Sequence, residues 1–135
     1  MIDYYNQIYT HIATATKTAH PLVKMTGEYT RSPAQFPCVT CEESGNIDIV
    51  ELTDSSRAEK FARLTYRIQV FSNSVSGKKA EARSIFSTVD TAIKELGFHR
   101  LTYTTTPDLY ESTVYSITAT YEAVISADGL IYGQQ

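Results

Sequence analysis

Apolar residues between Gly77 and Gly97 recur at steps of three and four positions, which is the most regular pattern in the chain. This spacing predicts an amphipathic helix with one buried side. Ser76 is expected to cap its first turn, and Gly97 to adopt the left-handed conformation that ends it. The buried stripe would consist of Ala82, Ile85, Phe86, Val89, Ile93 and Leu96. Such a helix needs a surface to pack on, so the pattern also predicts a sheet beside it.

The segments on both sides of this helix alternate between apolar and polar residues, as half-buried strands do. Residues 60–73, 98–106 and 112–125 are therefore predicted to be strands. In the first of them, the polar face carries Arg63 and Arg67. The apolar face is formed by Ala62, Leu64, Tyr66, Ile68 and Val70. One side of the sheet is thus expected to pack against helices and the other to face water or a partner.

The N-terminal part of the chain is predicted to contain one further helix and a hairpin. Apolar residues at helical spacing indicate a helix over residues 2–17, with Asp3 near the positive end of its dipole. Residues 36–43 and 47–52 are typical of two strands, joined by a turn at Ser44-Gly45-Asn46. The whole order of elements predicts an α+β fold: a two-layer sandwich with a largely antiparallel sheet and two helices packed on one face.

The length of 135 residues fits a single domain with a core over residues 36–125 and a C-terminal tail over residues 126–135. Residues 21–35 form a long connection without a sustained period. A connection of this length either has a function or packs on the sheet as an irregular hairpin. Three of its residues suit contact with another protein: Met25, Tyr29 and Arg31.

Composition excludes several classes of protein. The chain is 42% apolar and 20% charged and has two cysteines. Its apolar runs are too short to cross a membrane, and its first residues lack the pattern of a signal peptide, so we expect a cytoplasmic protein without structural disulfides and without a membrane partner. The net charge of −3 and the isoelectric point near 5.6 argue against a nucleic-acid-binding protein.

Charge is distributed unevenly along the chain. Residues 1–56 hold three basic and seven acidic groups, residues 57–100 hold nine and four, and residues 101–135 hold none and four. This asymmetry permits two interpretations: pairing between adjacent strands of one chain, or pairing between copies of the chain in an assembly.

Cys38 and Cys41 have the spacing of a zinc or redox pair. Residues three apart in a strand point to opposite faces, however, so both sulfurs cannot reach one ion without a turn. No second such pair is present, and the remaining candidate ligands are His11, His20 and His99. We therefore expect two small side chains in a sheet, with no metal and no cofactor.

No motif for catalysis is apparent in the sequence. There is no nucleophile elbow, and Gly77-Lys78-Lys79 lacks the upstream glycine of a phosphate-binding loop. The neighbouring carboxylates Glu42 and Glu43, or Asp108 and Glu111, are typical of solvated turns and strand ends. We expect no catalytic residues and a protein that is not an enzyme. The Tyr- and Thr-rich strands instead suit subunit contacts.

Four segments in this order resemble the tail-completion proteins of long-tailed bacteriophages, the family of tail terminators and tail-to-head joining proteins. They are FPCVTCEESGN, EKFARLTYRIQVFSN, SGKKAEARSIFSTVDTAIKELGFHR and PDLYESTVYSITATYEAVIS. The resemblance covers roughly residues 36–132. It implies a ring, commonly a hexamer, at the head-proximal end of the tail in the virion, assembled in the host cytoplasm.

The resemblance also implies the partners: other copies of the chain, the tail-tube protein whose polymerisation the ring ends, and the head connector. DNA would pass through the lumen without specific binding. We expect Arg63 and Arg67 to meet the acidic C-terminal third of a neighbouring copy. The expected interface residues are Met25, Tyr29, Arg31, Arg63, Arg67, Asp108, Glu111 and Tyr132. Two alternatives remain open: another head-tail connector or tail-tube-like protein, and a small α+β ligand-binding or enzymatic domain.

Overall fold

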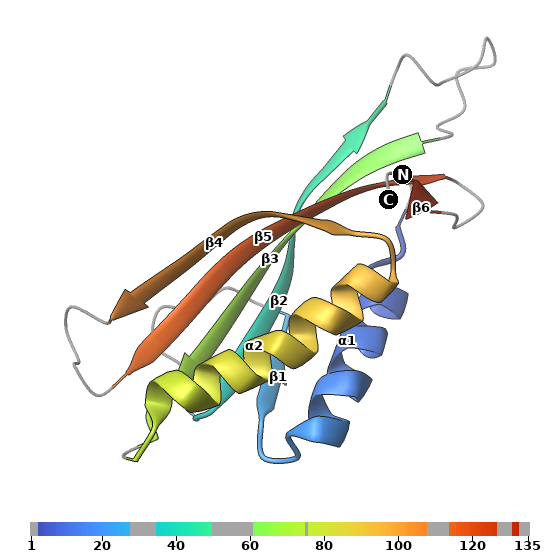
Figure 1. Cartoon of the computed structure of the whole chain (residues 1–135). Coiled ribbons are helices and arrows are strands. Elements are labelled where there is room, and N and C mark those ends of the chain that lie inside the picture. Colours follow the sequence, from blue (N-terminus) through green and yellow to red (C-terminus); the bar gives the residue numbers. More distant parts are fainter. Residues whose placement is uncertain are drawn as a thin grey trace, which may run out of the picture.

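The computed structural model describes residues 3–27, 35–49, 61–74, 76–107, 114–126 and 131–132. The elements in chain order are α1 (Tyr5–Ala19), β1 (Lys24–Thr26), β2 (Cys38–Asp48), β3 (Phe61–Ser72), α2 (Lys78–Glu95), β4 (His99–Pro107), β5 (Tyr115–Ser126) and β6 (Ile131–Tyr132). Both helices lie on one face of a single twisted sheet (Figure 1). The predicted α+β sandwich is confirmed.

The sheet has the strand order β1-β2-β3-β5-β4, and β6 pairs with the end of β5. Only the β1–β2 pair is parallel among the described strands. The β3–β5 ladder is the longest and runs without interruption from Phe61 opposite Ser126 to Ser72 opposite Tyr115. Strands β3 and β5 therefore form the centre of the sheet, and β4 forms one edge.

The core lies between the helices and the sheet, as the hydrophobic pattern predicts. Of the predicted α2 stripe, five residues are buried and Leu96 is partly buried against the core. All five predicted apolar residues of β3 are fully buried. The ring of Tyr66 stacks on that of Tyr5 from α1, with centroids 6.1 Å apart, and meets the edge of Phe98. The aromatic contacts thus join α1 to the centre of the sheet.

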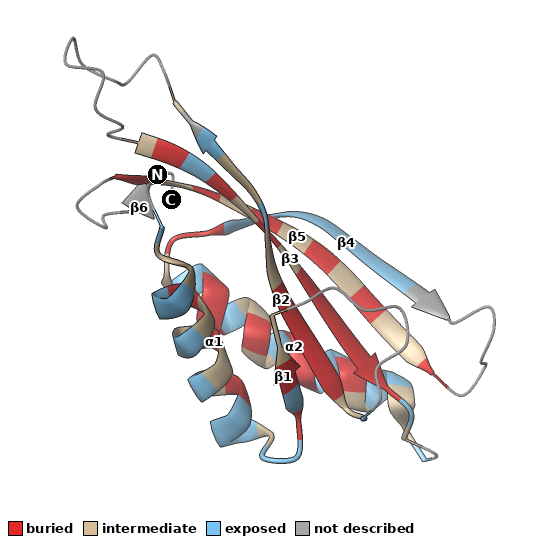
Figure 2. Cartoon of the chain, turned by 180° about the vertical axis from the view of Figure 1, so that it is seen from behind, coloured by how far each residue is buried: buried red, intermediate tan, exposed pale blue. Residues whose placement is uncertain are grey.

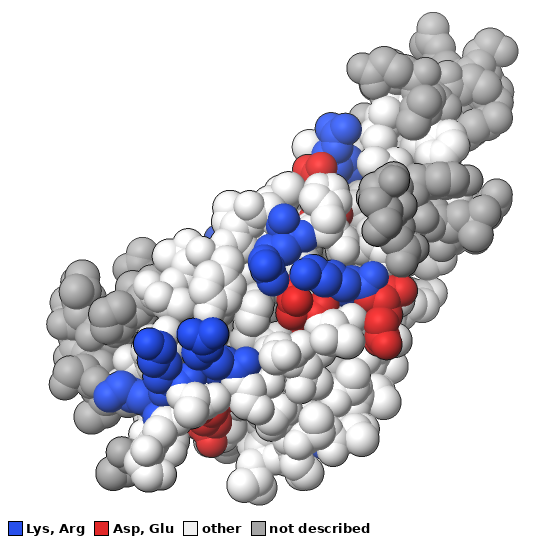
Figure 3. All heavy atoms as spheres, viewed as in Figure 1, with Lys and Arg blue, Asp and Glu red and all other residues white. Residues whose placement is uncertain are grey.

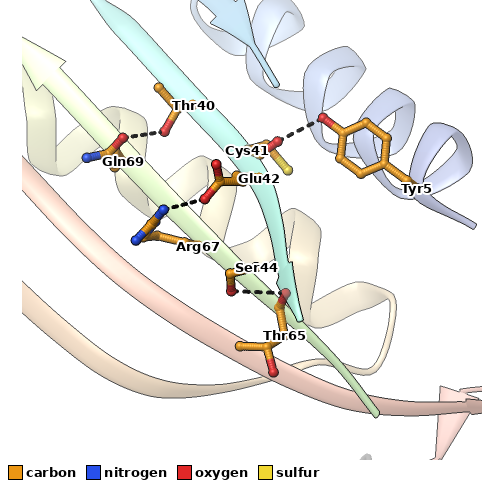
Figure 4. Close-up of polar contacts among 8 residues, drawn as sticks. All are labelled: Tyr5, Thr40, Cys41, Glu42, Ser44, Thr65, Arg67 and Gln69. Carbon is orange, nitrogen blue, oxygen red and sulfur yellow. Dashed lines mark hydrogen bonds and ion pairs between the residues drawn. The ribbon is translucent and has the colours of Figure 1, made fainter. Parts of the chain in front are cut away.

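The predicted hairpin in β2 is wrong. The strand continues from Cys38 to Asp48 along β3, and Ser44 lies where the register shifts between Glu43 and Gly45. The hydroxyl of Ser44 donates a hydrogen bond to the carbonyl of Thr65, 3.2 Å away (Figure 4). Ser44-Gly45-Asn46 therefore form a β-bulge and not a turn. The residues before and after the shift all pair with β3.

Two segments expected to be irregular contain short strands. Residues 24–26 of the long connection form β1, with Lys24 opposite Cys38. In the C-terminal tail, β6 pairs with Val124 and Ile125 of β5. Strands of two or three residues have too little periodicity to be recognised in sequence.

The helix ends agree only in part with the sequence. Gly97 has φ 99°, which confirms the left-handed end of α2. Ser76 does not cap this helix: Gly77 is the N-cap, and no side chain donates or accepts a capping bond there. At the start of α1, Asp3 Oδ1 accepts a hydrogen bond from the Tyr5 amide at 3.1 Å, consistent with its predicted place near the helix start.

Within the described ranges, no helix combines the length and apolar character that crossing a membrane requires.

Candidate assembly interface

The edge strand β4 is exposed from residue 99 to residue 105. Its sequence HRLTYTTTP favours a strand through the β-branched threonines, which need no burial to hold an extended backbone. Every residue from 99 to 105 is exposed, whereas most residues of β3 and β5 are buried or intermediate (Figure 2). Leu101 and Tyr103 are 48% and 42% exposed, so two large apolar side chains lie close together on the surface of this strand. This strand is the first candidate contact surface.

Besides its ladder with β5, side-chain contacts hold β4 against the rest of the molecule. Arg100 Nη1 donates to Asp90 Oδ1 on α2 at 2.9 Å. The Tyr103 ring meets Phe86 of α2 edge-on, with centroids 5.1 Å apart. The hydroxyls of Thr102 and Thr120 are 2.7 Å apart on the face without helices. Leu101 is skipped in the ladder with β5, where the register shifts between Arg100 and Thr102.

Asp90 is the centre of the polar contacts that connect α2, β4 and β5. Besides Arg100, it accepts a hydrogen bond from the Tyr121 hydroxyl at 2.6 Å and lies 3.2 Å from Lys94 Nζ. Burial alone would raise the pKa of Asp90, but the hydrogen bonds from Tyr121 and Lys94 and the charges of Lys94 and Arg100 lower its pKa below the ordinary value. The carboxylate is therefore ionised and locked at neutral pH.

The open face of the sheet carries charged pairs inside the chain. Arg67 Nη2 donates to Glu42 Oε1 across the β2–β3 ladder (Figure 4). Arg63 Nε lies 3.7 Å from Glu122 Oε1 of β5. Glu122 belongs to the acidic C-terminal third, so Arg63 meets that region within one chain. Pairing of either arginine with a neighbouring copy stays a prediction.

The structure does not gather the other expected interface residues into one site. Met25 lies in β1 with only 8% of its surface exposed and packs in the core. Four residues lie outside the described part of the chain: Tyr29, Arg31, Asp108 and Glu111. Tyr132 is in β6, paired with Val124, and its side chain lies outside the description.

A second candidate surface is the basic start of α2, which sequence reasoning missed. Figure 3 shows blue side chains gathered over the first turns of α2. The cations there are Lys78, Lys79 and Arg83, and none of them forms an ion pair with another described residue. Cations near a helix N-terminus oppose its dipole, so this cluster reduces helix stability. The sequence GKKAEAR, with its three basic residues, could have indicated this basic surface.

The two cysteines lie on opposite faces of β2, as predicted. Cys41 belongs to the main core, and Cys38 to a smaller cluster with Phe71 and Val114. Burial raises the pKa of the Cys41 thiol to about 12 and also raises that of Cys38. Both thiols are therefore protonated at neutral pH, which disfavours metal ligation and thiolate chemistry. In the described ranges, no three acidic, histidine or cysteine side chains are placed to hold a metal ion.

Comparison with known proteins identifies a shared fold. No protein-family model matches the chain. No curated protein is similar to it in sequence. A chain from a solved structure described as "Virion of native gene transfer agent (GTA) particle" is similar to it in structure, with 14% sequence identity and a TM-score of 0.59. The similarity covers 88% of this chain and 91% of that chain. At this identity the likeness establishes the fold alone.

Proposed function

We propose that this protein is a structural virion subunit that forms a ring, most simply a hexamer, at the head-proximal end of a phage tail. The ring ends polymerisation of the tail tube and joins the tail to the head connector. The observation that carries the proposal is the fold shared with a chain of a gene transfer agent virion over nearly the full length of both chains. The order of sequence segments that resembles tail-completion proteins supports the same role.

The surface of the molecule is consistent with assembly. The exposed edge strand β4 and the basic start of α2 are two separate surfaces without a partner among the described residues that could cover them. A subunit of a ring at the end of a tail needs exposed surface for its neighbours in the ring and for the tube and the connector. With a net charge of −3, the chain as a whole lacks the strong positive charge that would hold DNA, which suits a lumen through which DNA slides.

The first test is the state of assembly of the purified protein. We expect negative-stain images of closed rings and, by mass photometry, a species at six times the chain mass of 15.1 kDa. Open tubes would instead favour a tail-tube-like protein. A monomer at micromolar concentration, with no ring in purified particles, would contradict the proposal.

The second test addresses the position in the particle. Adding the purified protein to polymerising tail-tube subunits should stop elongation and leave tubes of limited length with a cap at one end. Particles produced without this protein should carry overlong tubes that lack heads. Tubes of unchanged length in both experiments would favour another connector role.

For the alternative of a ligand-binding or enzymatic domain, we consider a depression formed by described residues. It lies between α1 and α2 and is lined by Ala15, Ser87, Thr88, Thr91, Ala92 and Glu95. Its carboxylate, Glu95, lies 3.2 Å from His11 Nε2. Small side chains and a single carboxylate offer few groups that converge on a ligand, so the assembly role is the better supported proposal.

A further inference from the structure

We propose that β4 of one copy pairs with β1 of the next copy, so that the sheets of neighbouring subunits join into one continuous sheet around the ring. The inference rests on the proposed function and specifies its subunit interface. The occupant of the β4 edge is thus a second copy of this chain, contributing the opposite edge of the same sheet.

The first step of the argument is the state of the β4 edge. Proteins usually protect edge strands with short length, lysine or proline inside the strand, or a covering element. β4 is nine residues long, carries its only proline at the last position and has no lysine. Its neighbour in the sheet is β5 on one side, and no described strand lies on the other side along His99–Pro107. Such an edge is a template for strand addition.

The second step is the direction of the strands. β4 is antiparallel to β5, β5 to β3 and β3 to β2, while β1 is parallel to β2. It follows that β4 runs antiparallel to β1. Joining β4 of one copy to β1 of the next therefore forms an antiparallel pair with both sheets in the same orientation. The two edges differ, so the contact is head-to-tail, as a ring requires.

The third step is the register, which can be followed across the sheet. Thr104 lies opposite Thr118, Thr118 opposite Gln69, Gln69 opposite Thr40, and Thr40 opposite Thr26 of β1. With neighbouring sheets level, Thr104 of one copy therefore meets Thr26 of the next. The one charged residue of β1, Lys24, lies level with the neutral Thr106 of β4 in this register, so the two main chains can pair without like-charge repulsion.

The same register places the basic start of β4 level with the acidic part of β2, beyond β1. Arg100 lies level with Glu43 of β2 through Tyr121 and Tyr66. The start of β4 carries His99 and Arg100 with no acid, and β2 carries Glu42 and Glu43 with no base. The Tyr5 hydroxyl donates to the Cys41 carbonyl at 2.9 Å, so α1 already satisfies one main-chain group just past β1 (Figure 4). Main-chain pairing is therefore concentrated at β1, since Arg100 is bound by Asp90 and Glu42 by Arg67 within one chain.

The test is disulfide cross-linking between copies. The variant Thr26→Cys/Thr104→Cys places one thiol on each edge at the same level, where paired Cα atoms fall within the range of about 4.4–6.8 Å that a disulfide needs. Mild oxidation should yield a ladder of linked chains up to the ring size on non-reducing gels. Each single variant should give no linked species, because the native thiols of Cys38 and Cys41 are buried.

A matched control uses Thr26→Cys/His99→Cys. His99 is also exposed on β4, but it lies five residues from Thr104, roughly 17 Å along the strand. This variant should not cross-link. A linked dimer in the Thr104→Cys single variant would overturn the inference in favour of symmetric β4–β4 pairing.

A second variant tests the edge without cysteines. Thr102→Lys/Thr104→Lys adds the charges that protect natural edges, and both positions are exposed, so the fold should be retained by circular dichroism. We expect the concentration needed for ring formation to rise at least about tenfold. Rings in negative stain that persist unchanged, together with absent cross-links in the Thr26/Thr104 pair, would overturn the inference and leave the proposed function standing. Absence of rings in the unmodified protein would instead contradict the proposed function.

Discussion

Strands β3 and β4 lie two places apart in one sheet, yet they are built on different principles. β3 has a strand on each side and helix α2 over one face, and its inward-facing residues from Ala62 to Val70 are fully buried. Among the described strands, β4 has a neighbour on one side only, and all its residues from 99 to 105 are exposed. The buried positions of β3 require apolar side chains that fit the core. Exposure leaves the residues of β4 free to vary, so apolar side chains there point to a contact beyond the single chain.

The largest contrast between the two strands should be in core truncation. Ile68→Ala in β3 removes a fully buried side chain and should cost about 3 kcal/mol of the free energy of unfolding. Leu101→Ala in β4 should cost less than about 0.5 kcal/mol, because Leu101 is largely exposed. Urea unfolding at protein concentrations too low for assembly measures the unfolding free energies of both variants. Equal costs would remove the distinction between the strands.

The contact of β4 with α2 should be next in size. Asp90→Asn weakens the bonds to Arg100, Lys94 and Tyr121 and should cost about 2 kcal/mol at neutral pH. Since the folded state lowers the pKa of Asp90, its contribution is present above the unfolded value of 3.8 and is lost as the pH falls through the lower folded value.

Two measurements check this prediction. The difference in unfolding free energy between Asp90→Asn and the unmodified protein should shrink below pH 3.8. Amide hydrogen exchange of β4 should become faster in the variant, while that of β3 stays slow. Uniform acceleration in both strands would mean that Asp90 stabilises the whole domain and not β4 in particular.

A smaller effect is expected from a buried hydrogen bond of β3. The Tyr66 hydroxyl donates to Glu43 Oε1 at 3.2 Å, and Tyr66→Phe should cost about 1.5 kcal/mol at neutral pH. Burial raises the pKa of Glu43 above the usual 4.5, and the bond from Tyr66 partly opposes this. Without that bond the pKa of Glu43 should rise further. Protonation of Glu43 then removes the buried charge that has lost its hydrogen bond in the variant. Its cost should therefore be smaller at pH 4 than at pH 7; an equal cost would show that Glu43 does not respond to Tyr66.

The smallest effect should come from the outer face of β4. Thr102→Val removes the hydroxyl contact with Thr120 but keeps the β-branched shape, and water can replace the lost partner. We expect a change of about 0.3 kcal/mol in the unfolding free energy. A thermal or urea denaturation series against Thr120→Val should give matching small values. A loss above about 1 kcal/mol would show that this face of β4 stabilises the single chain.

Much of the candidate site could be predicted from the sequence, but the edge position of β4 could not. The strand over 98–106 and the polar side of β3 follow from alternation in the sequence. That β4 is an edge does not, because strand order depends on which ladders form, and β5 inserts between β3 and β4. The partner of Arg63 on β5 and that of Arg67 on β2 likewise depend on the register of each ladder.

The sequence by itself determined helix α2, strands β3 and β5 and the side of the sheet that is buried, because these depend on periodicity within each segment. The tertiary structure alone decided three things: that residues 24–26 join the sheet, that β2 passes through Ser44 without turning, and that β4 is left open at one edge. Each of these is a pairing between segments distant in sequence, and its free energy comes from contacts that no local pattern contains.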